Sequence, residues 1–328
     1  MGLADIFNQD AFSMFAMTAA IQKAPFQPGA LKGLINWEQH PVNMSQVIVE
    51  EFDGSLSLLP TAPRGAQSSM GSPEKRTVRS FIVPHIPHDD AVMADDVLNQ
   101  RAFGSENALE PIQTAVNRKL ARMRRNHETT HENLRAGALQ GIVQDADGST
   151  IYDLAAEFGQ TQLTNVWDPL NHSAKEVVIQ KRRIEDAVGV GIDSLDMRCI
   201  ASDGWFDAFT DGAEVKVAYD RWRDGEFLRV DNRRGFVFGG VEFINYRGAV
   251  GATPFLTANT AIMFPKNVPS MWLEVIAPAN FMETVGTSGQ LIYAKQNIMK
   301  NDVGVELHTQ SNYLPLCTRI DATLLWSL

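Results

Sequence analysis

Apolar residues recur at helical spacing over one long segment, from about residue 107 to residue 141. The members of this stripe lie three or four positions apart and are Leu109, Ile112, Val116, Leu120, Met123, His127, Thr130, Leu134, Ala138 and Gly141. At a rise of ~1.5 Å per residue, such a helix is about 50 Å long. A compact chain of this size has a diameter of only about 50 Å. The pattern therefore predicts a spine helix that crosses the whole molecule and a flat or elongated subunit.

Two β-prone segments precede the helix. Residues 46–60 alternate apolar and polar side chains, and residues 75–84 do so again, with a tip rich in Pro, Gly and Ser between them. The pair predicts a long β-hairpin. Because an isolated two-stranded hairpin is marginally stable in water, we expect it to lie on a neighbouring subunit. Arg64, Arg76 and Arg79 are then the charges expected to meet acids on that neighbour.

The N-terminal residues predict a short apolar helix, from Asn8 to Lys23, that contains Phe12 and Phe15. The next segment, APFQPGALKGLINW, has two prolines and two glycines and is typical of an extended arm. A short apolar helix followed by an arm seldom stabilises itself. We therefore expect this region to pack on another surface, with Phe12 and Phe15 as candidates for contact with another subunit.

The rest of the chain is mixed. Hairpin turns are predicted at Asp147-Gly148 and Gly239-Gly240, and helices over residues 203–211 and 213–223. A mixed sheet with flanking helices is expected over residues 185–300, and the last 25 or so residues are expected to return to the body as strands. The predicted fold class is α+β.

Composition narrows the function classes. Apolar residues make up 44% of the chain and charged residues 21%, as in a folded protein with a sizeable core, and no apolar run approaches the ~20 residues that span a bilayer. Two cysteines exclude a disulfide framework. The net charge of −10 argues against tight binding to DNA, although a protein can enclose DNA without gripping it.

The spine helix carries HETTH, residues 127–131, which matches the H-E-x-x-H motif of zinc peptidases. Its spacing places both histidines on one helical face, but no third ligand stands at a suitable position; Glu157 is the nearest acid and lies beyond the Asp147-Gly148 turn. Because His127 falls on the apolar stripe, we favour a packed histidine over a zinc ligand. We expect no metal, no cofactor and no catalytic residue.

The same helix carries a basic cluster, Arg118, Lys119, Arg122, Arg124 and Arg125. It is interpreted either as a solvated face that pairs with Glu128, Glu132 and neighbouring acids, or as a network of salt bridges between subunits. In the first interpretation Glu132 is a surface residue. Leu134, on the apolar stripe, is a further candidate for a contact between subunits.

Several segments, in order, resemble the lambda-like phage major capsid proteins, the major capsid protein E family. They include TAAIQKAPFQPGALKGL, VPHIPHDDAVMADDVLNQRAFG, ETTHENLRAGALQGIVQDADGSTIYDL, GWFDAFTDGAEVKVAYDRW, RGFVFGGVEFINYRG and QSNYLPL. The resemblance runs from about residue 13 to residue 318 and implies the HK97-type capsid fold. It implies an N-terminal arm over 1–45, an extended loop over 46–85, a peripheral domain over 86–184, an axial domain over 185–300 and C-terminal strands over 301–328.

The resemblance also implies a function: the structural head protein of a tailed double-stranded DNA phage, assembled as hexamers and pentamers into an icosahedral shell. Implied partners are copies of the same chain, a separate scaffold protein, a portal protein and a decoration protein, with no membrane and no sequence-specific DNA binding. The implied location is the virion, after assembly in the host bacterial cytoplasm. An encapsulin-like nanocompartment shell is the alternative, and a zinc peptidase a distant one.

Overall fold

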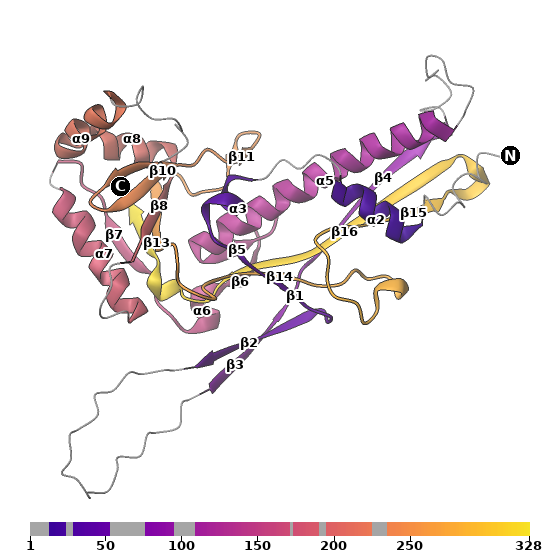
Figure 1. Ribbon diagram of the computed structural model, residues 1–328, viewed down its shortest axis with the longest axis horizontal. Helices are drawn as coiled ribbons and strands as arrows, with labels where there is room; N and C mark the ends of the chain where they lie inside the picture. Colours follow the sequence, from indigo (N-terminus) through magenta and orange to yellow (C-terminus); the bar gives the residue numbers. More distant parts are fainter. Residues whose placement is uncertain are drawn as a thin grey trace, which may run out of the picture.

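A computed structural model describes residues 13–23, 29–52, 76–94, 109–170, 173–189, 195–224 and 235–328. Its centre is helix α5 (Leu109–Gln140), which runs diagonally across the molecule in Figure 1. The 32 residues of α5 are about 48 Å long at ~1.5 Å per residue. The helix predicted over residues 107–141 is confirmed within two residues at either end.

A long strand, β16 (Gly304–Cys317), runs along the spine helix and is the central strand of a five-stranded sheet. In this five-stranded sheet the order is β1-β14-β16-β15, and β4 also pairs with β16. The partners of β16 are β4 (His85–Met93), β14 (Trp272–Ile276) and β15 (Tyr293–Ile298), and β1 (Glu38–Pro41) pairs with β14 at the edge of the sheet. The first half of β16 pairs antiparallel with β4 and β15, and its second half pairs antiparallel with β14. β16 therefore pairs with different strands along its two halves.

A second sheet has six strands in the order β7-β17-β13-β8-β10-β9 and mixes parallel with antiparallel pairs. Its strands are β7 (Leu163–Val166), β8 (Met197–Ala201), β9 (Phe236–Phe238), β10 (Val241–Asn245), β13 (Thr260–Pro265) and β17 (Leu324–Ser327). Helices α7 (Ala174–Val188), α8 (Asp203–Asp211) and α9 (Ala213–Asp224) pack on it. Trp167, Trp205 and Trp326 meet in its core. The predicted α+β fold class is confirmed.

Neither sheet is built from a single continuous stretch of the chain. β7 and α7 lie with the six-stranded sheet, whereas β14 and β15 lie with the five-stranded one. The predicted boundary between residues 184 and 185 falls inside α7. The named peripheral and axial ranges stay a prediction, and in the structure the chain crosses between the two bodies several times.

The predicted hairpin is present in the part of the chain that the structure describes. Strands β2 (Gln46–Phe52) and β3 (Arg76–Ile82) pair antiparallel and project from the body (Figure 1). The predicted turn at Gly239-Gly240 joins β9 to β10, and both glycines have positive φ, as a two-residue type I′ turn requires. The Asp147-Gly148 turn joins β5 (Ile142–Gln144) to β6 (Thr150–Asp153).

The remaining described elements are short. They are α2 (Met14–Lys23), α3 (Ala30–Leu34), α6 (Leu154–Phe158), β11 (Ala249–Val250), β12 (Thr253–Pro254) and the 3-10 turns Met282–Thr284, Lys300–Asp302 and Ile320–Ala322. No helix in the described part of the chain combines the length and apolar character needed to cross a membrane.

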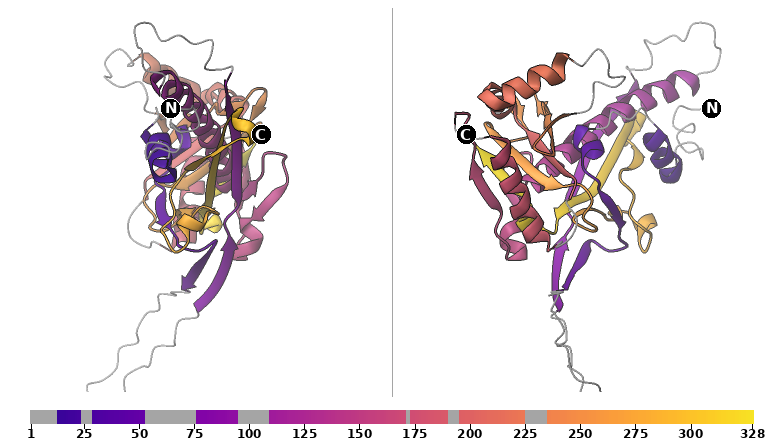
Figure 2. Two further views of the ribbon diagram at one scale, coloured as in Figure 1. Left: turned by 90° about the vertical axis from the view of Figure 1, so that its right-hand side faces the viewer. Right: turned by 60° about the vertical axis from the view of Figure 1, so that its left-hand side comes forward.

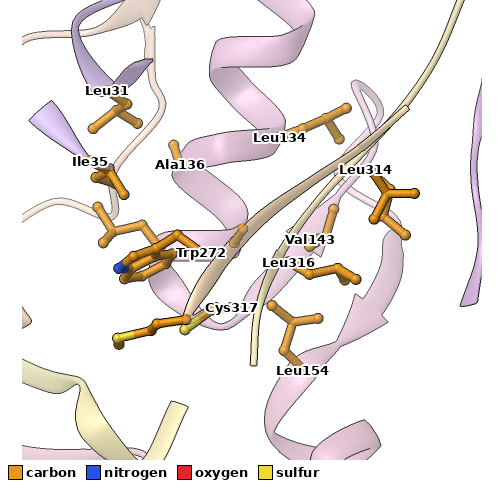
Figure 3. Close-up of a cluster of buried hydrophobic side chains, with 14 of the residues drawn as sticks. Leu31, Ile35, Leu134, Ala136, Val143, Leu154, Trp272, Leu314, Leu316 and Cys317 are labelled. Carbon is orange, nitrogen blue, oxygen red and sulfur yellow. The ribbon is translucent and has the colours of Figure 1, made fainter. Parts of the chain in front are cut away.

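Helices and sheet form two layers in the elongated half of the molecule. In the left view of Figure 2, α2 and α5 lie on one side of β4 and β16. A core between the layers joins the C-terminal half of α5 to β14 and β16; Leu134, Ala136, Trp272, Leu314 and Leu316 belong to it (Figure 3). A smaller core joins α2, the N-terminal half of α5 and β15.

The N-terminal helix finds its surface within its own chain. Met17 and Ile21 of α2 are buried against α5 and β15, and the Thr18 hydroxyl bonds with the backbone of Ala294. The expectation that this helix packs on another surface is therefore confirmed for its inner face, and α5 and β15 of the same chain provide that surface.

Candidate functional site

The HETTH histidines lie on the face of α5 that packs against β16, and both side chains are buried. The Nε2 atom of His127 is 3.0 Å from the hydroxyl of Thr309, and the Nε2 atom of His131 is 2.7 Å from the hydroxyl of Ser311. The two hydroxyls are two residues apart on β16 and so project from the same face of the strand. The motif thus joins the helix to the long strand at two successive positions.

The proton arrangement in these contacts follows from the hydroxyls. Each hydroxyl has a single proton to donate. Thr309 donates its proton to the carbonyl of His88 at 2.9 Å, and Ser311 donates its proton to the carbonyl of Leu291 at 2.5 Å. Both histidines must therefore donate from Nε2. Two parallel relays result, each running from an imidazole through a hydroxyl to a backbone carbonyl.

This arrangement differs from a zinc site. A histidine that ligates zinc through Nε2 carries no proton on that nitrogen, whereas both Nε2 atoms here donate to hydroxyls. Glu128, the acid of the motif, forms an ion pair with Arg124 at 2.7 Å. In the described part of the chain, no group of three metal-ligating side chains comes together. The geometry accounts for the motif by packing between helix and strand.

Burial keeps the two imidazoles neutral. Loss of solvent, together with the nearby rings of His88 and His308, lowers the pKa of His127 from 6.5 to about 4. Burial also lowers the pKa of His131, with smaller contributions from Arg135, His127 and Lys32. The ring of His131 lies 4.2 Å from that of Tyr313, centre to centre.

A pH dependence of stability follows from His127. Its pKa is lower in the folded chain than in the unfolded chain, so the unfolded chain takes up the proton first as the pH falls. The neutral ring of His127 makes its full contribution to the free energy of unfolding above pH 6.5. This contribution declines as the pH falls from about 6.5 to about 4. The difference between 6.5 and about 4 corresponds to ~3 kcal/mol. Denaturant unfolding between pH 7 and 5 should show a smaller pH slope for His127→Phe than for the wild type.

The matched control for that experiment is His40→Phe, because His40 is exposed on β1. It should keep the wild-type slope. A His127→Phe variant with an unchanged slope would contradict the assignment, since the loss of stability in acid would then come from other groups.

A buried ionic network lies one turn further along α5. The Nε atom of Arg135 donates to Glu274 of β14 at 2.8 Å, and the hydroxyl of Tyr313 donates to the same carboxylate at 2.7 Å. Arg135 also lies 3.6 Å from Glu132 and stacks over the ring of Tyr313. Burial raises the pKa of Tyr313, which therefore stays protonated. The spine helix is tied to both β14 and β16 through this network.

Glu132 connects three parts of the molecule. Its Oε1 atom accepts from the backbone N–H of Leu31 in α3 at 2.8 Å and from the hydroxyl of Tyr246 at 3.0 Å. Tyr246 directly follows β10 of the six-stranded sheet, and burial raises its pKa. The expectation that Glu132 is a surface residue is wrong, because α3 and Tyr246 cover this side of the spine helix.

Replacing Glu132 with glutamine should destabilise the subunit by about 1–3 kcal/mol, since one buried acceptor then loses its charge against Arg135, Leu31 and Tyr246. Glu157→Gln, at an exposed position of α6, is the matched control and should change stability by less than ~0.5 kcal/mol. Denaturant unfolding at pH 7 measures both. Equal effects of the two substitutions would contradict the role assigned to Glu132.

The predicted contact residues fall in different environments. Phe15 is 69% exposed on α2 and is available to a neighbour, whereas Leu134 is 2% exposed and is buried within its own subunit. Arg79 lies with its guanidinium 5.4 Å from the ring centre of Phe158. Phe12 and Arg64 lie outside the described residues, and for Arg76 the structure describes the backbone, in β3.

The structure adds apolar residues that the sequence interpretation missed. On the outer face of the hairpin, Ile48 is 62% exposed, Val78 55% and Ile82 59%. The register places Ile48 opposite Ser80, and Gln46 opposite Ile82, so these side chains share one face. The opposite face is buried and contains Val47 and Phe81. The sequence shows that apolar and polar residues alternate along these strands. It does not show which face of the hairpin the body of the subunit covers.

A groove of about 600 Å³ adjoins this face at the base of the hairpin, lined in part by Met44, Ile48, Gly286 and Ser288. Close to the groove, the loop before β15 exposes Met282 and Val285. Exposed apolar surface therefore continues from the hairpin to the body. Such patches on a folded subunit are typical of surfaces that bind other proteins.

Comparison with known proteins decides the family. The family model described as "Phage major capsid protein E" matches residues 13–325. The chain belongs to the phage major capsid protein E family. It is 27% identical over 292 residues to the major capsid protein of Pseudomonas phage KPP10, covering 82% of this chain and 83% of that protein. It is 24% identical to the major capsid protein of Salmonella phage Felix O1, covering 95% of each.

Solved capsid structures share the fold of this capsid protein. The mature capsid of bacteriophage PhiM1 matches with a TM-score of 0.53 and 13% identity, over 93% of this chain and 89% of that one. The capsid of an empty GTA particle matches with a TM-score of 0.52 and 9% identity, over 93% and 92%. The predicted HK97-type fold is confirmed. The protein is a major capsid protein of a tailed phage, a structural component of the virion that assembles into a shell.

Proposed function

We propose that this capsid protein forms the hexamers and pentamers of an icosahedral phage head, and that the outer face of the β2–β3 hairpin binds the neighbouring subunit. The observation that supports this contact is the apolar face of Ile48, Val78 and Ile82, which is exposed on an element that projects from the body (Figure 1). Exposed apolar side chains are poorly solvated by water. Burying them against a neighbouring subunit therefore lowers the free energy at every copy of the interface.

The other predicted contacts are further parts of the proposed interface. Arg64, Arg76 and Arg79 lie on the extended loop, and Phe12 and Phe15 near the N-terminus. We propose that the arginines meet acids on the neighbour and that Phe15, exposed on α2, fits into another subunit. Contacts spread along an arm and a loop let a thin subunit bury an area of the order of 2,000–5,000 Å², as obligate interfaces do.

Further partners are part of the proposal. A separate scaffold protein would guide assembly in the host bacterial cytoplasm, a portal protein would occupy one vertex, and a decoration protein would bind the finished head. The shell would enclose double-stranded DNA without reading its sequence. The described similarity to phage capsid proteins favours this role over an encapsulin-like nanocompartment.

We also propose that the protein is not an enzyme and holds no zinc. Support comes from the relays, in which both Nε2 atoms of the HETTH histidines donate to hydroxyls, and from the ion pair that engages Glu128. The zinc peptidase alternative has no geometric support in the described part of the chain.

One preparation tests both proposals. The chain is co-expressed with its scaffold protein and purified, and electron micrographs should show closed shells with five- and six-fold capsomers. Elemental analysis of the same shells should find far less than one zinc per chain. Soluble monomers without shells would contradict the structural role, and one zinc per chain, lost in His131→Ala, would contradict the absence of metal.

A further inference from the structure

The outer surface of α5 carries a stripe of three arginines that the described fold leaves exposed. Arg118, Arg122 and Arg125 lie four and three residues apart and so project from one helical face. Arg122 pairs with Asp90 at 3.1 Å but stays largely exposed. Within the described part of the chain, neither Arg118 nor Arg125 forms an ion pair. The first interpretation of the basic cluster thus agrees with the structure at these exposed arginines and at Arg124, which pairs with Glu128 as that interpretation expects.

The opposite face of the same body carries charges of both signs, among them Lys295, which pairs with Glu283, and two exposed carboxylates. On β16 the residues that meet α5 are Thr309 and Ser311, so Glu306 and His308 project to the other side of the sheet. The register pairs His308 with Asp89 of β4, which is exposed on that side too. The two exposed carboxylates, Glu306 and Asp89, therefore lie on the sheet face, whereas the arginine stripe lies on the helix face.

The shape of the molecule relates these faces to a shell. Figure 1 views the subunit down its shortest axis, and the left view of Figure 2 shows the helix layer and the sheet layer separated along that axis. A thin subunit in a closed shell presents one broad face to the lumen and the other to the outside. The chain as a whole has a net charge of −10, so a cationic face is a local departure from its average.

We propose that the Arg118–Arg122–Arg125 stripe faces the lumen of the head and contacts the backbone phosphates of the enclosed duplex DNA. The inference rests on the shell function proposed above. From Arg118 to Arg125 the helix rises about 10 Å, which spans a few phosphates of one strand. The contact reads no sequence, because it reaches phosphates alone. The net negative charge of the chain keeps this contact weak. Because the contact is electrostatic, it is also sensitive to salt. The stripe therefore binds the enclosed DNA only weakly.

Chemical footprinting tests the proposal in the assembled particle. Arginines are modified with phenylglyoxal in unassembled subunits, empty shells and DNA-filled heads, and the modified peptides are quantified by mass spectrometry. We expect Arg118 and Arg125 to react in subunits and in empty shells and to be protected in filled heads. Protection in empty shells would place the stripe in a contact between subunits and overturn the proposal. Equal reactivity in all three states would overturn it as well.

A pair of double variants provides a second measurement. Arg118→Gln/Arg125→Gln removes two charges from the stripe, and Arg182→Gln/Lys216→Gln removes two from exposed positions on α7 and α9. Binding of a short DNA duplex to unassembled subunits is followed from ~20 to ~200 mM salt. Removing the stripe should lower the slope of log K against log salt by about 2, because each phosphate contact contributes ~0.9; the control pair should leave the slope unchanged.

Equal changes in the two variants, or no measurable binding by the wild type at ~20 mM salt, would overturn the assignment to the stripe. This assay uses free subunits, so it decides the role of the stripe even where shells fail to form. Missing shells in electron micrographs, by contrast, count against the proposed function alone.

Discussion

Replacing Leu134 with aspartate is expected to leave the subunit insoluble or unfolded. Leu134 is 2% exposed and packs in the core between α5, β14 and β16 (Figure 3). The change removes a buried apolar side chain, which costs about 2–5 kcal/mol, and adds a carboxylate without a designed partner, which costs several kcal/mol more. The sum is comparable with the whole stability of a typical protein, about 5–15 kcal/mol. Soluble yield and circular dichroism measure the outcome.

The matched control is Thr129→Asp, which introduces the same side chain on the exposed face of the same helix. It should give soluble, cooperatively folding protein with a change in stability within ~0.5 kcal/mol. If both variants fold equally well, the face of α5 assigned to the core is the wrong one.

Ile48→Asn together with Val78→Asn should spare the fold and abolish shells. Both side chains are more than half exposed, so the subunit loses little of its own packing. Each interface loses the apolar area of two side chains; a loss of ~1–2 kcal/mol per contact weakens each association about five- to thirty-fold. A closed shell repeats that loss at every copy. Sedimentation and negative-stain microscopy after co-expression with the scaffold protein measure the outcome.

The conservative pair Ile48→Val and Val78→Ile keeps the apolar area and serves as the control, and it should assemble normally. Normal shells from the asparagine variant would remove this face of the hairpin from the proposed assembly contact. An unfolded asparagine variant would instead place the two side chains in the core of the subunit.

Periodicity along the chain was enough to predict the elements that matter most. The helical stripe of α5 predicts its extent within two residues, and the paired glycines at 239 and 240 predict a turn because glycine adopts positive φ without strain. Local spacing also predicts that His127 packs inward. These features depend on backbone geometry and on neighbours within a few residues, so one sequence contains the information for them.

The partners of the buried charges could not be predicted in the same way. Glu132 meets Leu31 and Tyr246, about 100 residues away on either side, and Arg135 meets Glu274. On the helix alone, Glu132 and Arg135 look like a solvated i, i+3 pair; only the approach of α3, β14 and Tyr246 buries them. The two relays from His127 and His131 likewise depend on β16, some 180 residues further on.

By itself the sequence therefore determined the spine helix, the hairpin, the α+β class and, through the order of its segments, the resemblance to the capsid family. The tertiary structure alone decided which face of each element is covered, and with it the burial of Glu132 and Leu134, the exposed face of Ile48 and Val78, and the exposed arginine stripe. The physical reason is that periodicity defines two faces of an element, whereas burial depends on what packs against them, and those partners come from distant parts of the chain.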